Sequence, residues 1–169
     1  MYLKHFFTSF FCLVAYTIYV RVYESRLDLL KAVIVGPKGT PYHNGLFFFD
    51  ICLPSNYPIS PPVVRYHFAG LGISPNLTSS CGIVRLSLPK TNGDLEHVWV
   101  PGTSTILQLL VSIQDLIFNS HPFFNGYKTA RMRGSVDGER YSLLYNENTI
   151  RKTLKTMVYT MKNPPKVKS

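Results

Sequence analysis

Short apolar runs separated by turn residues dominate the first 70 residues of the chain. Strand-like runs cover residues 18–23, 29–35, 46–53 and 63–68. Glycine, proline and asparagine separate the runs, as they do in the tight connections between neighbouring strands. This pattern predicts a four-stranded antiparallel meander, in which each strand pairs with the next one along the chain.

A long segment without regular periodicity follows the strand-like runs. Residues 69–103 carry eight glycines and prolines, at positions 70, 72, 75, 82, 89, 93, 101 and 102. Loops of this length inside a compact domain usually carry function or lack structure of their own. We therefore expect the chemistry of the protein to reside in this loop.

Helical spacing begins after the loop. Residues 104–118 place apolar side chains on one broad face, at Ile106, Leu109, Leu110, Ile113, Leu116 and Ile117. Thr103 or Ser104 is the expected N-cap of this helix. A last amphipathic helix is expected over residues 141–161, ended by Pro164 and Pro165, with these side chains facing inward: Leu143, Ile150, Leu154, Met157 and Met161. Strands, then a long loop, then helices indicate an α+β domain.

The N-terminus holds an uncharged apolar run over residues 6–20. The run has the length of a signal-peptide apolar region and is shorter than the ~20 residues that span a bilayer. It fits either a helix or strand buried in the domain, or a signal or membrane anchor. We divide the chain into an apolar leader over residues 1–17, a core domain over residues 18–162 and a basic tail over residues 163–169.

Composition narrows the class of protein. The chain has 169 residues, 46% of them apolar and 16% charged, which is typical of one packed domain. Of its net charge of +9, +7 falls in residues 128–169. The basic end over residues 151–168 lacks the kind of aromatic interleaving that stacks on bases. We therefore expect no nucleic-acid partner and interpret the basic C-terminal end as a solvated helix face.

Cysteine and histidine usage excludes two further classes. The three cysteines are too few and too scattered for a disulfide scaffold, and the five histidines show no metal-ligand spacing. No metal or cofactor is expected. A reducing compartment, cytoplasmic or nuclear, is the expected location, and membrane association through residues 6–20 is the alternative.

One proline motif carries a family resemblance. Tyr57-Pro58-Ile59-Ser60-Pro61-Pro62 follows one strand and precedes the next, and the loop beyond contains Pro75-Asn76 and Trp99-Val100-Pro101. Together these motifs resemble the core of ubiquitin-conjugating enzymes. The sequence of these motifs is most similar to that of the large plant-type members of the phosphate-homeostasis group and of the animal hybrid conjugating enzyme–ligase. The resemblance implies the ubiquitin-conjugating-enzyme fold: a four-stranded meander, a long active-site loop and C-terminal helices.

The resemblance also implies thioester chemistry, but this chain lacks the cysteine which that chemistry requires. The family forms a thioester between ubiquitin and one cysteine, and an upstream asparagine, here Asn76, is thought to hydrogen-bond the developing oxyanion. The family pattern is Asn, four residues, Gly, two residues, Cys. Here Asn76 is followed by five residues, Gly82, two residues and Arg85. The catalytic cysteine position is therefore occupied by Arg85, which cannot form a thioester.

Other residues offer weaker candidates. Cys81 is the only cysteine in the loop, but it lies four residues before Arg85, so we interpret it as a bystander and only alternatively as the nucleophile. Cys52 is expected to be a small core residue of its strand. Trp99, with Pro101, is expected to anchor the loop against the last core helix.

Four hypotheses of function follow. The first is a conjugating-enzyme-like variant without thioester catalysis that binds ubiquitin, a ubiquitin-activating enzyme, a charged conjugating enzyme or a ubiquitin ligase. The others are an active ubiquitin-transferring enzyme using Cys81, a non-functional partial gene copy, and a membrane-tethered adaptor that uses residues 6–20.

Overall fold

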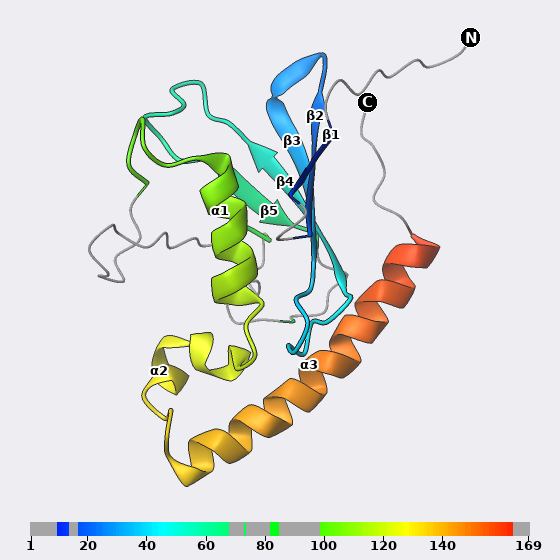
Figure 1. Cartoon of the computed structure of the whole chain (residues 1–169), viewed down its shortest axis with the longest axis vertical. Coiled ribbons are helices and arrows are strands. Elements are labelled where there is room, and N and C mark those ends of the chain that lie inside the picture. Colours follow the sequence, from blue (N-terminus) through cyan, green and yellow to red (C-terminus); the bar gives the residue numbers. More distant parts are fainter. Residues whose placement is uncertain (1–9, 14–16, 68–72, 74–81, 85–98, 164–169) are drawn as a thin grey trace.

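The structure is a computed structural model that describes residues 10–13, 17–67, 73, 82–84 and 99–163 (Figure 1). Within these residues, five antiparallel strands form one sheet whose spatial order follows the chain. The strands are β1 (Phe10–Leu13), β2 (Ile18–Tyr23), β3 (Arg26–Val35), β4 (Leu46–Cys52) and β5 (Val63–Tyr66). The predicted four-stranded meander is confirmed as β2 to β5, and β1 adds a fifth strand at the edge.

The edge strand β1 lies in the range that the sequence assigns to an apolar leader. Its residues pair with β2 in antiparallel register, Phe10 opposite Arg21 and Leu13 opposite Ile18. The described part of the apolar run therefore contributes β1 and the first residues of β2 to the sheet. Among the described residues, the structure contains no helix whose length and apolar composition would let it cross a bilayer.

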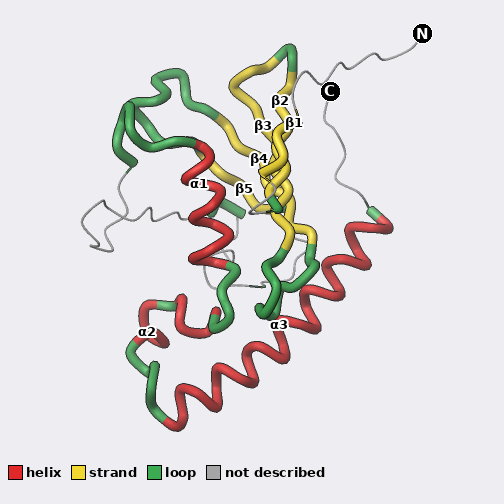
Figure 2. The backbone as a smooth tube through the Cα atoms, in the orientation of Figure 1, coloured by secondary structure: helices red, strands yellow, loops and turns green. Residues whose placement is uncertain are grey.

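Helices follow the sheet in the order α1 (Ile106–Ser112), α2 (Tyr127–Ala130) and α3 (Val136–Lys162), with a π-helical turn at Ile113–Ile117 and a 3-10 turn at Pro122–Asn125. Figure 2 shows α1 lying across one face of the sheet and α3 running diagonally past its end. The predicted α+β architecture is confirmed.

Aromatic side chains join the sheet to the first helix. Phe118, just beyond the π-helical turn, stacks on Phe47 of β4 with ring centroids 4.4 Å apart. Tyr42, from the loop between β3 and β4, meets both rings edge-on, at 4.9 Å from Phe118 and 5.8 Å from Phe47. Edge-to-face and offset contacts of this kind add to the stabilisation from area burial alone. All three side chains are essentially inaccessible to solvent.

The start of α1 differs from the sequence prediction by one residue. The N-cap is Thr105, not Thr103 or Ser104: its hydroxyl accepts a hydrogen bond from Gln108 N at 3.1 Å, and Gln108 Oε1 accepts one from Thr105 N at 2.9 Å. This reciprocal capping box satisfies two amide groups of the first turn. The helix then widens into the π-helical turn, which shifts the face of later residues, so the predicted inward Leu116 is exposed.

The inward face of α3 was also predicted wrongly. Small residues face the protein, namely Gly138, Ser142, Thr149, Thr153 and Thr156, whereas Leu143 and Met161 are 72% and 81% exposed. The close approach of α3 explains why. A Cβ on Gly45 of the β3–β4 loop would lie 2.8 Å from Thr153 Cγ2, and one on Gly138 would lie 2.0 Å from Met132 O. Large apolar residues do not fit on this face.

The outer face of the sheet carries a polar network around Asp50. His67 Nε2 lies 2.6 Å from Asp50 Oδ2, and Lys31 Nζ lies 3.6 Å from Asp50 Oδ1. Burial raises the pKa of Asp50. The hydrogen bond with His67 and the charges of His67 and Lys31 together lower the pKa by more than burial raises it, so the pKa lies below its ordinary value.

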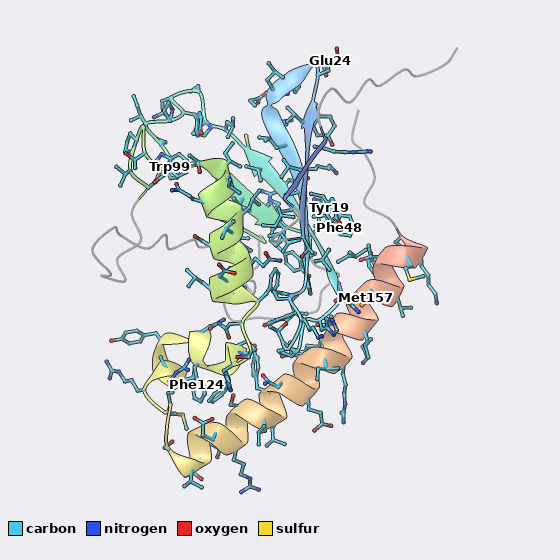
Figure 3. The ribbon with its side chains drawn as sticks, viewed as in Figure 1. Tyr19, Glu24, Phe48, Trp99, Phe124 and Met157 are labelled. Atoms are coloured by element: carbon cyan, nitrogen blue, oxygen red, sulfur yellow. The ribbon has the colours of Figure 1, made fainter. Side chains whose placement is uncertain are left out.

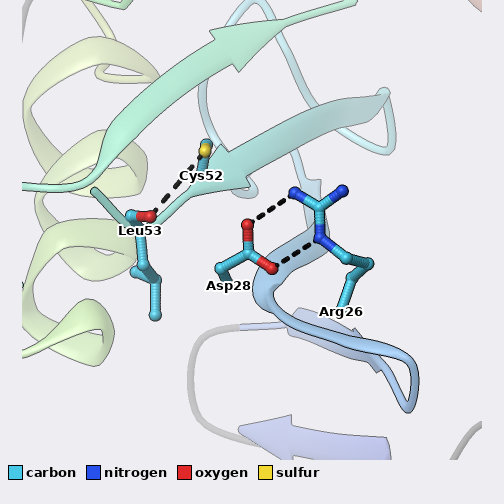
Figure 4. A network of polar contacts seen from close by, with 4 residues as sticks. All are labelled: Arg26, Asp28, Cys52 and Leu53. Carbon is cyan, nitrogen blue, oxygen red and sulfur yellow. Dashed lines mark hydrogen bonds and ion pairs between the residues drawn. The ribbon is translucent and has the colours of Figure 1, made fainter. Parts of the chain in front are cut away.

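Cys52, predicted as a core residue, is exposed at the end of β4. Side chains alternate between the faces of a strand, and it is the preceding residue, Ile51, that is buried. Figure 4 shows Cys52 with its Sγ 3.9 Å from Leu53 O, near the hairpin end where Arg26 holds Asp28 through two hydrogen bonds of 2.8 and 2.7 Å. This hydrogen bonding lowers the pKa of Asp28.

Phe47→Ala should destabilise the protein strongly, because it removes the ring on which both Tyr42 and Phe118 pack. Truncation of a buried phenylalanine costs about 3–5 kcal/mol of unfolding free energy. Chemical denaturation followed by circular dichroism measures the loss. Leu27→Ala, at a position of β3 that is 70% exposed, is the control and should change stability little. Equal losses in the two variants would contradict this account of the core.

Asp50→Asn should lower stability at pH 7 by no more than about 1 kcal/mol, since the pair is partly exposed. Because the folded pKa of Asp50 lies below the unfolded value of about 3.9, its contribution is present above that value. It is lost as the pH falls through the folded pKa. Denaturation curves of both proteins between pH 7 and pH 2 should therefore converge at the acid end; a difference that grows on acidification would refute the assignment.

Candidate functional site

A glycine and the two residues that follow it fix the middle of the long loop against the sheet. Tyr66 N of β5 donates to Gly82 O at 2.8 Å, and Val84 N donates to Val64 O at 2.9 Å. Ile83 lies between them as an antiparallel bridge partner of Arg65. Gly82 has φ +71°, a left-handed conformation that favours glycine. Val84 is buried, so the chain passes into residue 85 from a point held by both backbone pairing and packing.

Tyr42 fixes the first part of the loop. Its hydroxyl donates to Ile73 O at 3.0 Å, and both side chains are fully buried. Tyr42 belongs to the aromatic core through its contacts with Phe47 and Phe118. The hydrogen bond therefore connects the core of the domain directly to the first part of the loop.

Trp99 fixes the point where the loop rejoins the described structure. Its Nε1 donates to Pro58 O at 2.6 Å, and its ring lies 5.8 Å from that of Tyr57, which precedes a cis peptide bond to Pro58. Figure 3 shows Trp99 beside the start of α1. Trp99 is thus an anchor, but its hydrogen bond and ring contact are with the proline motif, which the sequence analysis did not anticipate.

The three residues that the sequence singles out for chemistry are Asn76, Cys81 and Arg85. All three lie outside the described residues. Chain connectivity nevertheless relates them to the anchors: Asn76 follows Ile73 by three residues, Cys81 directly precedes Gly82, and Arg85 directly follows Val84. The predicted site residues are thus all within three residues of a fixed point.

Two exposed apolar side chains lie next to one of the three fixed points of the loop, which together we call the frame. Ile59 and Val100 are 70% and 47% exposed, and each neighbours a member of the hydrogen-bonded pair Pro58 and Trp99. The sequence analysis missed them, because a sequence pattern does not show which side chains of an irregular segment are exposed. Contiguous exposed apolar side chains are common at protein-binding surfaces, and each of these two adjoins one partner of the same hydrogen bond.

Tyr66 is a second feature that the sequence analysis missed. Its hydroxyl is buried and has no hydrogen-bond partner among the described residues. Burial raises the pKa of this phenol, which keeps it protonated at neutral pH. The strand alternation predicts an inward Tyr66, but the environment of its hydroxyl depends on packing that a sequence pattern does not contain. The described residues hold no group of three or more metal-ligating side chains.

Comparison with known proteins shows which family and which individual proteins the chain is similar to. The family model described as "Ubiquitin-conjugating enzyme" matches residues 14–133. A protein of Arabidopsis thaliana named probable ubiquitin-conjugating enzyme E2 25 is 58% identical over 150 residues, which cover 88% of this chain and 24% of that protein. The human dual E2 ubiquitin-conjugating enzyme/E3 ubiquitin-protein ligase BIRC6 is 41% identical over 153 residues, 88% of this chain and 3% of BIRC6.

A solved structure agrees with these sequence matches. The E2 domain of a Toxoplasma gondii ubiquitin conjugating enzyme superposes with a TM-score of 0.61 at 25% sequence identity, covering 83% of this chain and 88% of that domain. The chain spans about a quarter of the Arabidopsis relative described above, so most of that relative lies beyond the region of similarity.

The single tryptophan of the chain allows the frame to be tested directly. Native Trp99 should show blue-shifted emission and resist quenching by iodide, because its side chain is buried. Tyr57→Ala removes the ring beside it and should raise the quenching constant toward that of free indole. Ile59→Ala, an exposed position of the same motif, should leave quenching unchanged. Strong quenching of the natural protein would show that Trp99 is not held as described.

Proposed function

The chain belongs to the ubiquitin-conjugating enzyme family, and on that premise we propose that it acts in the ubiquitin conjugation pathway as a binding variant without thioester catalysis. Its partners in this proposal are ubiquitin and a ubiquitin-activating enzyme or ubiquitin ligase. The observation that carries the proposal is Arg85, which occupies the position of the nucleophilic cysteine in the family pattern.

The chemistry of arginine supports the loss of catalysis. Thioester formation needs a thiolate, which is both a good nucleophile and a good leaving group. The guanidinium group stays protonated, with a pKa above about 12, and its nitrogens act only as hydrogen-bond donors. Arg85 therefore cannot carry ubiquitin through the acyl transfer that the family pattern implies. Asn76, the predicted oxyanion donor, would then act only as a loop residue.

The pairing of the loop with β5 supports the register that places Arg85 at this position. Gly82 and Val84 are hydrogen-bonded to Tyr66 and Val64 on either side of a bridge. The inserted residue lies before Gly82, whereas the interval from Gly82 to Arg85 matches the family spacing. The insertion therefore falls outside the segment that pairs with β5, and the spacing from this segment to Arg85 is that of the family pattern.

Retained binding is supported by the frame around the loop. The hydrogen bond from Trp99 to Pro58 holds the proline motif and the end of the loop together, and Ile59 and Val100 stay exposed beside it. A domain that loses its nucleophile keeps such a surface, because none of these residues takes part in acyl transfer. The apolar pair is the surface that we assign to a protein partner.

A charging assay tests the proposal. Incubation with ubiquitin-activating enzyme, ATP and ubiquitin should give no reductant-sensitive adduct on the natural chain. Arg85→Cys should give one, because the substitution restores a thiol at the anchored position. Cys81→Ser is the matched control: if the natural chain forms an adduct that Cys81→Ser abolishes, the chain is an active enzyme using Cys81 and the proposal is wrong.

The binding part is tested on the same preparations. The immobilised natural chain should retain ubiquitin or the activating enzyme without a covalent bond, and Ile59→Ala combined with Val100→Ala should reduce retention. A folded natural chain that retains neither protein and gives no adduct, even as Arg85→Cys, is the outcome expected of a non-functional partial gene copy.

A further inference from the structure

The outward face of α3 carries an apolar stripe with coiled-coil spacing. Val136, Leu143, Ile150 and Met157 recur every seven residues, and Leu154 and Met161 lie four residues after two of them. Spacings of seven and four keep side chains on one line along a helix. All of these side chains except the partly buried Met157 are exposed. The stripe extends along most of the 27-residue helix, about 40 Å at 1.5 Å per residue.

This stripe is separate from the face by which α3 docks on the protein. The docking face consists of Gly138, Ser142, Thr149, Thr153 and Thr156, and the buried hydroxyls of Ser142, Thr153 and Thr156 have no hydrogen-bond partner among the described residues. In Figure 1, α3 runs along one edge of the molecule with the other described elements on one side of it. The larger apolar side chains of the helix therefore remain uncovered.

The charges along α3 are arranged so that they complement a reversed copy of the same helix. Residues 137–147 contain Asp137, Glu139, Arg140 and Glu147, whereas residues 151–162 contain Arg151, Lys152, Lys155 and Lys162. A parallel partner would bring basic halves together. An antiparallel partner brings the acidic half against the basic half and also opposes the two helix dipoles favourably.

We infer that this stripe on α3 is a self-association surface, on which the same stripe of a second copy of the chain packs in antiparallel orientation about a two-fold axis. Such an interface is self-complementary, so one surface serves both copies. Centring the pair between residues 148 and 149 puts Leu143 opposite Leu154 of the other copy, and Val136 opposite Met161. Glu147 lies within the stripe, and its carboxylate is already in an ion pair with Arg151.

This inference is independent of the fate of the catalytic position, because neither Arg85 nor the long loop contributes to α3. Association by one helix face would leave the proline motif and Trp99 available to other proteins. It also accounts for the unexpected distribution of side chains on α3, in which small hydroxyl residues are buried against the domain while large apolar residues are exposed.

Sedimentation velocity of the full chain over a range of concentrations tests the inference. The natural chain should show a reversible monomer–dimer equilibrium. Leu143→Gln combined with Leu154→Gln should weaken association at least about tenfold, the change expected when two apolar contacts per copy are lost from an interface. Leu27→Gln, which alters an equally exposed leucine of β3, should leave association unchanged. Circular dichroism establishes that all variants remain folded.

Cross-linking tests the orientation. A mixture of Leu143→Cys and Leu154→Cys chains should form a disulfide between these two positions, identified by peptide mass spectrometry, whereas Leu143→Cys alone should not link to itself. A natural chain that is monomeric at every concentration overturns the inference. So does dimerisation that the double glutamine variant leaves intact, a link between two copies of residue 143, or dimerisation that Leu27→Gln abolishes.

Discussion

Phe118, at the end of the first helical segment, stacks on Phe47 of β4, and this contact joins the two layers of the domain. Tyr42 packs against both rings, and its hydroxyl donates a hydrogen bond to the carbonyl oxygen of Ile73. The aromatic cluster therefore serves two purposes at once. It fills the space between sheet and helix, and it ties the first part of the long loop to the most buried part of the protein.

The long loop is held at several points by contacts that involve no catalytic residue. Backbone pairing of Gly82 and Val84 with β5 fixes its middle, and the Trp99 indole holds its end against Pro58. Because these contacts are made by the backbone or by residues outside the reacting position, replacement of one residue at position 85 need not disturb them. Under the proposed function, this separation of frame and chemistry explains how the fold can persist without the nucleophile.

Much of the fold follows from local pattern. Short apolar runs separated by turn residues identify β2 to β5, and the motif around Tyr57 indicates the family. The sequence pattern gives wrong predictions where tertiary packing determines which side chains are buried. The sequence assigns Leu143 to the core because apolar helix faces normally point inward, but the close approach of Gly45 and Thr153 leaves room only for small residues. The exposed Cys52 and the helix cap at Thr105 depend likewise on strand ends and turn geometry.

The candidate site likewise contains residues that the sequence identifies and residues that only the structure reveals. Arg85 and Asn76 are identified by spacing along the chain, whereas the anchors at Tyr42 and Val84 require the three-dimensional structure, since hydrogen bonds across tens of residues leave no sequence signal. The central claim is that this frame is intact and lacks only a nucleophile. Intact-protein mass spectrometry after charging tests it most directly. The account predicts unmodified mass for the natural chain and one thiol-labile ubiquitin on Arg85→Cys; a thiol-labile ubiquitin on the natural chain would contradict it.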